Sequence, residues 1–440
     1  MRRPLAPRLL LVPALAAAFS AGLAVDRAAE AARRGGGQVY RPLDVFADVL
    51  AHVENSYVEE VDAQELVYGA VDGLMGRLDP HSSFMRPEAF RALRDDTTGE
   101  FDGLGIEVTI ERGELTVVSP TADSPGERAG IRPGDRILSI DGAPTKELSL
   151  AESTRRMKGP AGSKAVLELM REGFAEPQKL TLVRDRVRTQ SVELRLVDPA
   201  RRTAYVRVKA FQERTDRGLE KALEDARRAY GGELGGLVLD LRNNPGGLLD
   251  QAVRVADVFL ASGVIVSTEG RGKRTVEVEK AREKDTEPGY PLIVLVNRGT
   301  ASASEIVAGA LQDHGRAVIM GTPTFGKGSV QTLIELEDGS GVKLTVARYY
   351  TPKHRSIQEL GIAPDVIVPE AAPALPAEGP GERDLRRHLR NEAVPVPAVA
   401  KAEPPAADDH QLRTALDYLR AVGIFKSSLQ APRGVASKRE

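Results

Sequence analysis

Cysteine is absent from this chain of 440 residues. Disulfides, thiolate metal sites and cysteine nucleophiles are therefore excluded, and a nucleophile has to be a hydroxyl, an amine or a carboxylate. An excess of positive charge is also lacking, because 61 Lys and Arg face 63 Asp and Glu, for a formal net charge of −2. Without a global basic field, we expect no binding of nucleic acid.

Long apolar runs are also scarce, and a single one stands at the N-terminus. Three arginines precede the nearly uncharged run from Leu9 to Val25, which Asp26 ends. This pattern predicts that residues 1–25 are a signal peptide or a membrane anchor, two alternatives that the sequence leaves open. We therefore expect an extracytoplasmic protein, in the periplasm, secreted or anchored to the inner membrane.

The remaining sequence changes its hydrophobic period several times. Apolar residues at helical spacing predict a helical N-terminal region, and its last turn, Leu78–Phe84, is predicted to hold capping residues and no reaction centre. Short strands follow, and then apolar strands that alternate with helices, which predicts an α/β sheet covered on both faces. The predicted regions are 38–97 (helical), 98–188 (short strands), 189–370 (α/β core), 371–407 (linker rich in Pro and Ala) and 408–425 (C-terminal helix).

Small residues between a predicted strand and a predicted helix form the first candidate site. In Gly299–Val307, a serine hydroxyl would lie near a helix N-terminus, where backbone N–H groups and the helix dipole stabilise a developing oxyanion. Ser302 and Ser304 are alternatively simple helix caps. The serines alone leave both interpretations open.

The segment Gly321–Gln331 is a near match to a phosphate-binding loop. Gly328 occupies the position whose hydroxyl should bind Mg²⁺, and a strand is predicted to follow where a phosphate site needs a helix. We therefore reject nucleotide binding. Lys327 is then either an amine in a dry site or a solvated turn lysine, and Gln331 would share its face if both stood on one strand.

A tight turn follows the predicted buried strand around Asp240. Gly246 and Gly247 either form an ordinary turn or allow a close backbone approach that supplies an oxyanion donor.

Together, Asp240–Gly247, Thr300–Asp313 and Phe325–Gln331 resemble, in this order, the carboxyl-terminal processing (tail-specific) peptidases. The resemblance implies a multidomain α/β fold with a crotonase-like or ClpP-like core. It also implies that Ser302 is the nucleophile, that Lys327 is the general base and that Gln331 supports the lysine. It implies no metal and no cofactor.

The segment Ala129–Gly142 resembles a bacterial PDZ domain. In that family, the loop that matches Leu104, Gly105 and Ile106 holds the terminal carboxylate of a peptide, which adds to the domain as an extra strand.

The resemblance thus implies a serine endopeptidase that cleaves extracytoplasmic proteins near or from their C-termini, recruited by PDZ binding of the tail. The expected oxyanion donors are the N–H groups of Ala303 and of Gly246 or Gly247. A homo-oligomer formed through the N-terminal helical region and an activating partner are left open. The alternatives are a PDZ binding module with an inactive peptidase-like core and a crotonase-like acyl-CoA enzyme.

Overall fold

The computed structural model describes residues 42–370, 386–387 and 409–430. The chain divides into two compact units, Met1–Leu74 and Met75–Glu440. In the first unit residues 42–56 are helical, and helix α2 (Ala63–Met75) begins there. The predicted signal peptide or anchor lies outside the described residues. Within the described ranges, no helix is both long and apolar enough to cross a membrane.

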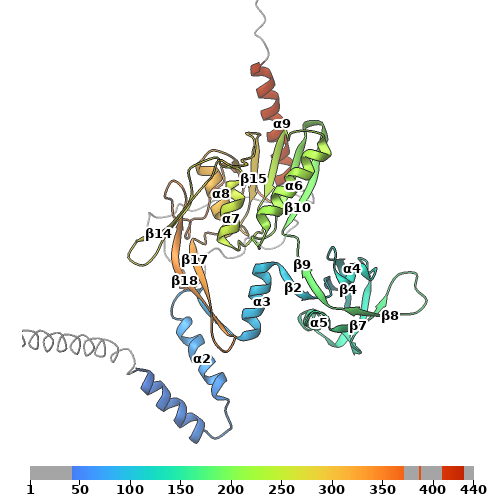
Figure 1. Ribbon diagram of the computed structural model, residues 1–440, viewed down its shortest axis with the longest axis vertical. Coiled ribbons are helices and arrows are strands. Elements are labelled where there is room, and N and C mark those ends of the chain that lie inside the picture. Colours follow the sequence, from blue (N-terminus) through green and yellow to red (C-terminus); the bar gives the residue numbers. More distant parts are fainter. Residues whose placement is uncertain (1–41, 371–385, 388–408, 431–440) are drawn as a thin grey trace, which may run out of the picture. The chain divides into compact units, whose positions relative to one another are not determined.

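The short strands predicted for residues 98–188 form an antiparallel sheet in the order β3-β4-β5-β7-β8, with β6 on β5. In β7 the residues Ala165, Leu167 and Leu169 are buried and alternate with more exposed neighbours, as expected of a strand with one face on the core. The ribbon β2-β9 pairs the two ends of this region (Figure 1). The elements are β2 (Glu100–Gly103), β3 (Ile106–Glu111), β4 (Glu114–Pro120), α4 (Pro125–Arg128), β5 (Arg136–Ile140), β6 (Ala143–Pro144), η1 (Thr145–Glu147), α5 (Leu150–Met157), β7 (Lys164–Met170), β8 (Gln178–Val183) and β9 (Asp185–Arg188).

A six-stranded sheet in the order β10-β11-β12-β15-β16-β19 forms the core of the α/β region. All neighbours in it are parallel except the edge pair β10-β11. Every residue of β12 and β15 is buried, because helices cover both faces of the sheet. The elements are β10 (Val192–Asp198), η2 (Pro199–Arg201), β11 (Thr203–Val208), α6 (Thr215–Tyr230), β12 (Gly236–Asp240), α7 (Leu249–Asp257), β15 (Leu292–Val296), α8 (Ala303–Asp313), β16 (Val318–Gly321) and β19 (Val366–Ile367).

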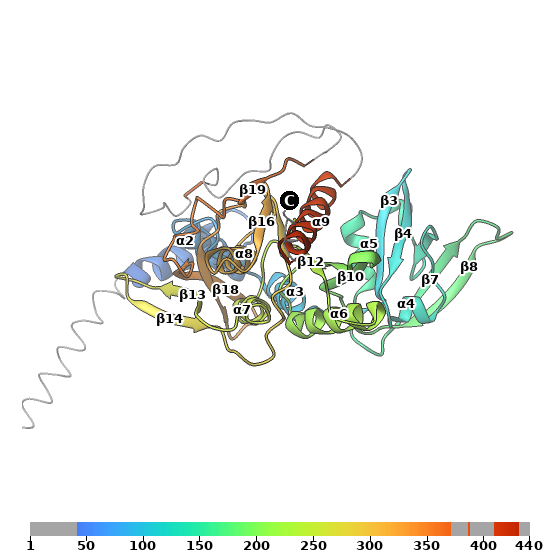
Figure 2. The same cartoon turned by 90° about the horizontal axis from the view of Figure 1, so that it is seen from above.

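Helices α6, α7 and α8 pack on one face of this sheet, and the C-terminal helix α9 (His410–Gln430) packs on the other (Figure 2). Ala415 and Leu419 of α9 contact a cluster that includes Val238, Ile293 and Met320 of the strands. The predicted C-terminal helix therefore exists and closes the second face. Most of the predicted linker 371–407 lies outside the described residues.

A second sheet in the order β1-β18-β13-β14, with β17 on β18, lies beside the core. Its first strand, β1, begins at Ser83, within the segment Leu78–Phe84, and Ser83 pairs with Lys343 of β18. The turn that the sequence analysis treated as local is thus attached to the α/β region. The elements are β1 (Ser83–Met85), α3 (Pro87–Thr98), β13 (Val264–Glu269), β14 (Thr275–Lys280), β17 (Ser329–Glu335) and β18 (Gly341–Tyr350).

Candidate functional site

Ser302 stands at the turn between β15 and α8, as the cap of the helix. Its backbone has φ 56° and ψ −116°, a region that costs a residue with a Cβ on the order of 1–3 kcal/mol. The turn is held by bonds to the segment after β12, because Thr300 Oγ1 donates to Leu241 O at 2.8 Å and Ala301 N–H donates to Asn244 O at 3.0 Å. Ser302 is therefore presented in a strained, fixed conformation, 8% exposed.

The second serine of the motif has a different environment. Ser304 is fully buried, and its Oγ donates to Asn244 O at 3.0 Å. His314 ends the same helix as its C-cap, and its Nε2 lies 2.7 Å from Val264 O. Since α8 has 11 residues, its two ends are separated by about 16 Å. This geometry favours Ser302 over Ser304 as the reactive hydroxyl and keeps His314 at the other end of the helix.

The carboxylate of Glu305 joins the turn that contains Ser302 to the loop that contains Lys327, the lysine loop. Its Oε2 accepts the backbone N–H groups of Ser302 at 2.7 Å and of Lys327 at 3.0 Å. Its Oε1 accepts Gly326 N–H at 2.8 Å and Thr324 Oγ1 at 2.5 Å. Because one oxygen binds both nitrogens, the backbones of Ser302 and Lys327 lie within two hydrogen-bond lengths of each other.

The burial of the Glu305 carboxylate is electrostatically unfavourable. The residue has no exposed surface, and burial raises the pKa of its carboxyl to about 7, although the bonds from Thr324, Gly326 and the other donors oppose the shift. The start of α8 also favours a negative charge there. No role for Glu305 was predicted from the sequence. A glutamate three residues after a helix cap is the sequence signal for this back-bonding.

Glycines allow close packing around Lys327. A Cβ on Gly326 would lie 2.9 Å from the backbone of Glu359, and one on Gly328 would lie 2.5 Å from Gln358 N. Gly328 N–H also donates to the buried Gln358 side chain at 3.0 Å. The lysine loop is thus pressed against residues about 30 positions later, contacts that the loop sequence does not reveal.

A strand, β17, follows the loop that contains Lys327, as predicted. The same strand corrects another expectation. β17 begins at Ser329, so Lys327 precedes it, and the register shifts between Val330 and Gln331. Strand alternation therefore cannot place Lys327 and Gln331 on one face. Gln331 Nε2 instead donates to Ser329 Oγ at 2.8 Å and to Thr345 Oγ1 at 3.4 Å.

The glycine turn after β12 lies directly against the serine. A Cβ on Gly246 would lie 3.0 Å from the Cβ of Ser302 and 3.0 Å from Ala303 N. Gly246 N–H already donates to Asn244 Oδ1 at 2.9 Å. Gly247 forms a bridge with Phe211, and a Cβ there would lie 2.1 Å from Phe211 O. Both glycines are therefore required by close backbone approaches, and the nearer one has an engaged N–H.

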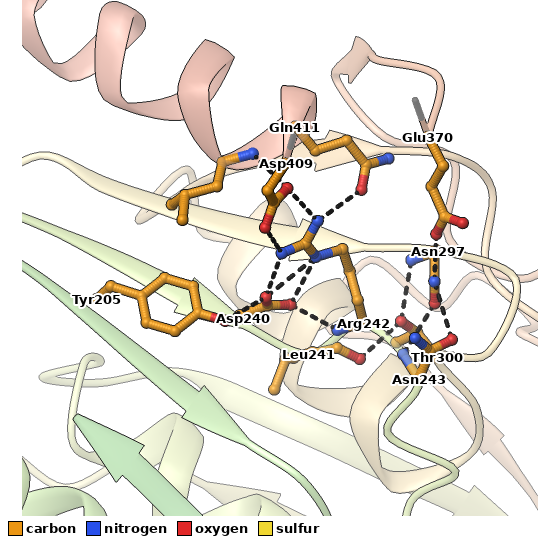
Figure 3. Close-up of polar contacts among 11 residues, drawn as sticks. Tyr205, Asp240, Leu241, Arg242, Asn243, Asn297, Thr300, Glu370, Asp409 and Gln411 are labelled. Atoms are coloured by element: carbon orange, nitrogen blue, oxygen red, sulfur yellow. Dashed lines mark hydrogen bonds and ion pairs between the residues drawn. The ribbon is translucent and has the colours of Figure 1, made fainter. Parts of the chain in front are cut away.

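An ion-pair network fixes the entry to this turn (Figure 3). Arg242 binds Asp240 through Nη2 at 2.6 Å and Asp409 through Nη1 at 2.7 Å and Nη2 at 2.8 Å. Gln411 adds a contact to Arg242 Nη1 at 3.0 Å, and Tyr205 donates to Asp240 Oδ2 at 2.7 Å. Although burial opposes the charge on Arg242, its carboxylate partners raise its pKa. The start of α9 is thereby tied to the segment that leads to Gly246.

A second group of contacts, centred on Asn297, holds the same segment. Asn297 Oδ1 accepts Asn243 N–H at 2.9 Å, and Asn297 Nδ2 donates to Asn243 Oδ1 at 3.0 Å and to Glu370 Oε1. Figure 3 shows these side chains beside Thr300. The turns after β12 and β15 are therefore locked to each other. This network was not predicted from the sequence.

The predicted carboxylate loop of the small antiparallel domain is held by α4. Leu104 is buried and its carbonyl accepts Gly126 N–H at 2.8 Å. Gly105 has φ 66°, and a Cβ there would lie 2.3 Å from the Cβ of Ser124. Ile106 begins β3, and α5 packs against this strand. The loop thus has a fixed backbone at the end of a strand-helix pair, the geometry that strand addition of a peptide requires.

No group of three or more His, Asp or Glu side chains in the described parts of the chain is arranged to hold a metal ion.

Comparisons with known proteins agree with this arrangement of domains. Residues 202–368 match the family model described as peptidase family S41, residues 116–171 match a PDZ domain, and residues 23–89 match the "Activating protease CtpB N-terminal domain".

Named relatives and a solved structure are similar along most of the chain. A carboxy-terminal-processing protease of Bartonella bacilliformis is 43% identical over 394 residues, covering 87% of this chain and 89% of its own. A carboxyl-terminal-processing protease of Synechocystis is 42% identical over 310 residues, covering 69% of this chain and 71% of its own. The solved structure of a photosystem II D1 C-terminal processing protease is 33% identical, with a TM-score of 0.43 and coverage of 74% and 92%.

Proposed function

The chain belongs to peptidase family S41 and is a serine-type carboxy-terminal processing protease with a PDZ domain, and on this premise we propose that Ser302 and Lys327 form its catalytic dyad. The observation that carries the assignment is the carboxylate of Glu305, whose Oε2 accepts the N–H groups of both residues. A serine and an amine brought together in this way can perform acyl transfer without a histidine.

In the proposed reaction, neutral Lys327 accepts the proton of Ser302 Oγ while that oxygen attacks the scissile carbonyl. Collapse of the tetrahedral intermediate breaks the C–N bond, and the lysine ammonium protonates the leaving amine. Water then adds to the acyl-enzyme, with Lys327 again as the base, and Ser302 is regenerated. Gln331 is proposed to orient the lysine by a hydrogen bond.

The oxyanion of the intermediate requires preorganised N–H donors. Ala303 is the first residue of α8, and no acceptor among the described residues occupies its N–H. For the second donor, we favour Gly247 over Gly246, because the Gly246 N–H already binds Asn244 Oδ1.

Substrate capture is proposed to use the backbone N–H groups of Leu104, Gly105 and Ile106. These would bind the C-terminal carboxylate of a polypeptide while its last residues pair with β3. The apolar side chains of Leu104 and Ile106 pack on the core of this domain, which suits an apolar C-terminal residue.

The compartment and assembly also belong to the proposal. The arginine-flanked apolar segment supports export, as fits processing proteases of this kind, and fractionation that finds the intact protein in the cytosol would contradict it. Exposed apolar side chains on residues 42–56, among them Leu43, Val45 and Val49, support assembly through the N-terminal helices or binding of an activating partner.

One experiment tests the proposed activity directly. Purified protein and its Ser302→Ala variant are incubated with an unfolded protein that ends in an apolar residue, and the products are examined by mass spectrometry. We expect fragments with the wild type alone. If neither form produces fragments while both bind the tail, the chain is the binding module with an inactive core. If the wild type instead converts an acyl-CoA and leaves polypeptides intact, the crotonase-like alternative applies.

A further inference from the structure

The turn before β1 contains a carboxylate that is buried far from the catalytic motifs in sequence. Asp79 is 9% exposed. It accepts bonds from Ser82 Oγ at 2.6 Å, Ser82 N–H at 3.0 Å, His81 N–H at 2.9 Å and Thr345 Oγ1 at 3.1 Å. Burial alone would raise the pKa of Asp79, but these bonds lower it below its ordinary value. The group is therefore a carboxylate at neutral pH, and its charge opposes the lowering of the Lys343 pKa that burial causes.

Thr345 connects this carboxylate to Gln331. The two residues are cross-strand partners on β17 and β18, and Gln331 Nε2 lies 3.4 Å from Thr345 Oγ1. The pairing of β1 with β18 brings the Asp79 turn to the same place, and Thr345 N–H donates to Ser82 Oγ at 3.0 Å. A continuous chain of polar contacts thus runs from Asp79 through Thr345 to Gln331.

The donor and acceptor properties of these groups fix the direction of each hydrogen bond between Asp79 and Gln331. A carboxylate only accepts hydrogen bonds, whereas a hydroxyl has one proton to donate. Because Thr345 gives its proton to Asp79, it can only accept from Gln331, so the amide NH₂ of Gln331 has to face it. Ser329 Oγ accepts from the same nitrogen at 2.8 Å. The two ends of an amide have nearly the same shape, so packing alone would not select between them.

We propose that Asp79, acting through Thr345, is a positioning residue that sets the orientation of the Gln331 amide and thereby presents Oε1 to the amine of Lys327. An oxygen there accepts one N–H of the neutral amine and leaves the lone pair of the amine for the proton of Ser302. A reversed amide would donate to that lone pair and occupy it. The inference depends on the proposed Ser302/Lys327 mechanism.

The central test is Thr345→Val, which keeps the shape of the side chain and removes the hydroxyl. On a peptide substrate, we expect kcat to fall about tenfold, the value of one lost hydrogen bond, with KM changed less than about twofold. Thr345→Ser should restore most of kcat. The acidic limb of kcat/KM against pH should move to lower pH in Thr345→Val, because the reversed amide disfavours the ammonium. Thr275→Val, an exposed threonine on β14, is the matched control and should leave kcat unchanged.

A double-mutant cycle separates positioning from a merely structural role. If Thr345 acts through Gln331, Thr345→Val should not lower kcat any further in a protein that already carries Gln331→Ala. An equal loss in both backgrounds, or wild-type kcat for Thr345→Val, would overturn the proposal. Asp79→Asn should resemble Thr345→Val if it folds, and Thr345→Val serves as the test if it does not. The variants Ser302→Ala and Lys327→Ala, measured in parallel, test the dyad separately from the role of Asp79, because turnover in either variant would refute the dyad itself.

Discussion

The small antiparallel domain and the α/β core build their sites in opposite ways. The carboxylate loop at Gly105 is fixed by Ser124, less than 20 residues away, within one continuous segment. The proposed catalytic site joins turns around Gly246 and Ser302, the loop at Lys327 and strand β18, which are separated by up to about a hundred residues. Tail binding thus depends on contacts within one continuous segment, whereas the proposed catalysis depends on contacts between distant segments. Substitutions should therefore affect tail binding and turnover separately.

The largest difference between turnover and tail binding is expected for substitution of Lys327, the proposed general base. Lys327→Arg keeps a positive charge but cannot supply a neutral amine at working pH. We expect turnover to fall by at least about a thousandfold, close to the loss for Lys327→Ala, while the affinity for a fluorescent tail peptide stays unchanged. Cleavage assays and fluorescence anisotropy measure the two quantities. Near-normal turnover of Lys327→Arg, together with an inactive but folded His314→Ala, would replace the Ser/Lys mechanism by a Ser/His one.

Glu305 provides the next test, because it belongs to the core alone. The pKa of its carboxyl is about 7 in the folded protein, above the ordinary 4.5, so the folded state holds the proton more firmly. Its contribution to stability is therefore full below about pH 4.5 and is lost as pH rises through about 7, with a slope of up to about 1.4 kcal/mol per pH unit. Urea unfolding between pH 5 and pH 8 measures this slope.

Glu305→Gln is the matched variant. It cannot titrate, so the slope should flatten by the same amount. Its NH₂ group also replaces one oxygen that accepts two hydrogen bonds, and we expect kcat to fall about a hundredfold from the loss of these two bonds, with tail affinity unchanged. Equal slopes for both proteins would show that Glu305 does not titrate in this range.

The smallest effect is expected at the carboxylate loop of the small antiparallel domain. Gly105→Ala places a Cβ 2.3 Å from Ser124 at φ 66° and should distort the carboxylate loop. We expect KM for a free-acid tail to rise about tenfold with kcat at saturation unchanged. C-terminal amidation of the peptide should raise KM of the wild type by a similar factor. It should hardly change KM of the variant, because the distorted loop no longer binds the carboxylate. Equal binding of acid and amide by the wild type would contradict carboxylate capture.

The sequence alone determined the elements and the motifs. Hydrophobic periodicity is a local property, so the buried strands β12 and β15, helix α8 and the C-terminal helix could be predicted from it. The positions of Ser302, Lys327 and Gln331 were supplied by resemblance, and from the residues themselves Ser302 and Ser304 were equivalent.

Tertiary structure alone decided which groups meet. The four donors on Glu305, the pairing of Arg242 with Asp409 and the path from Asp79 through Thr345 to Gln331 join residues up to about 270 positions apart. Each buried polar group has to find a partner, but the identity of that partner depends on how sheets and helices pack. The spacing of residues in the sequence does not reveal that partner. The contact between the Asp79 turn and the proposed catalytic site could therefore not be predicted from a sequence that indicates only local capping.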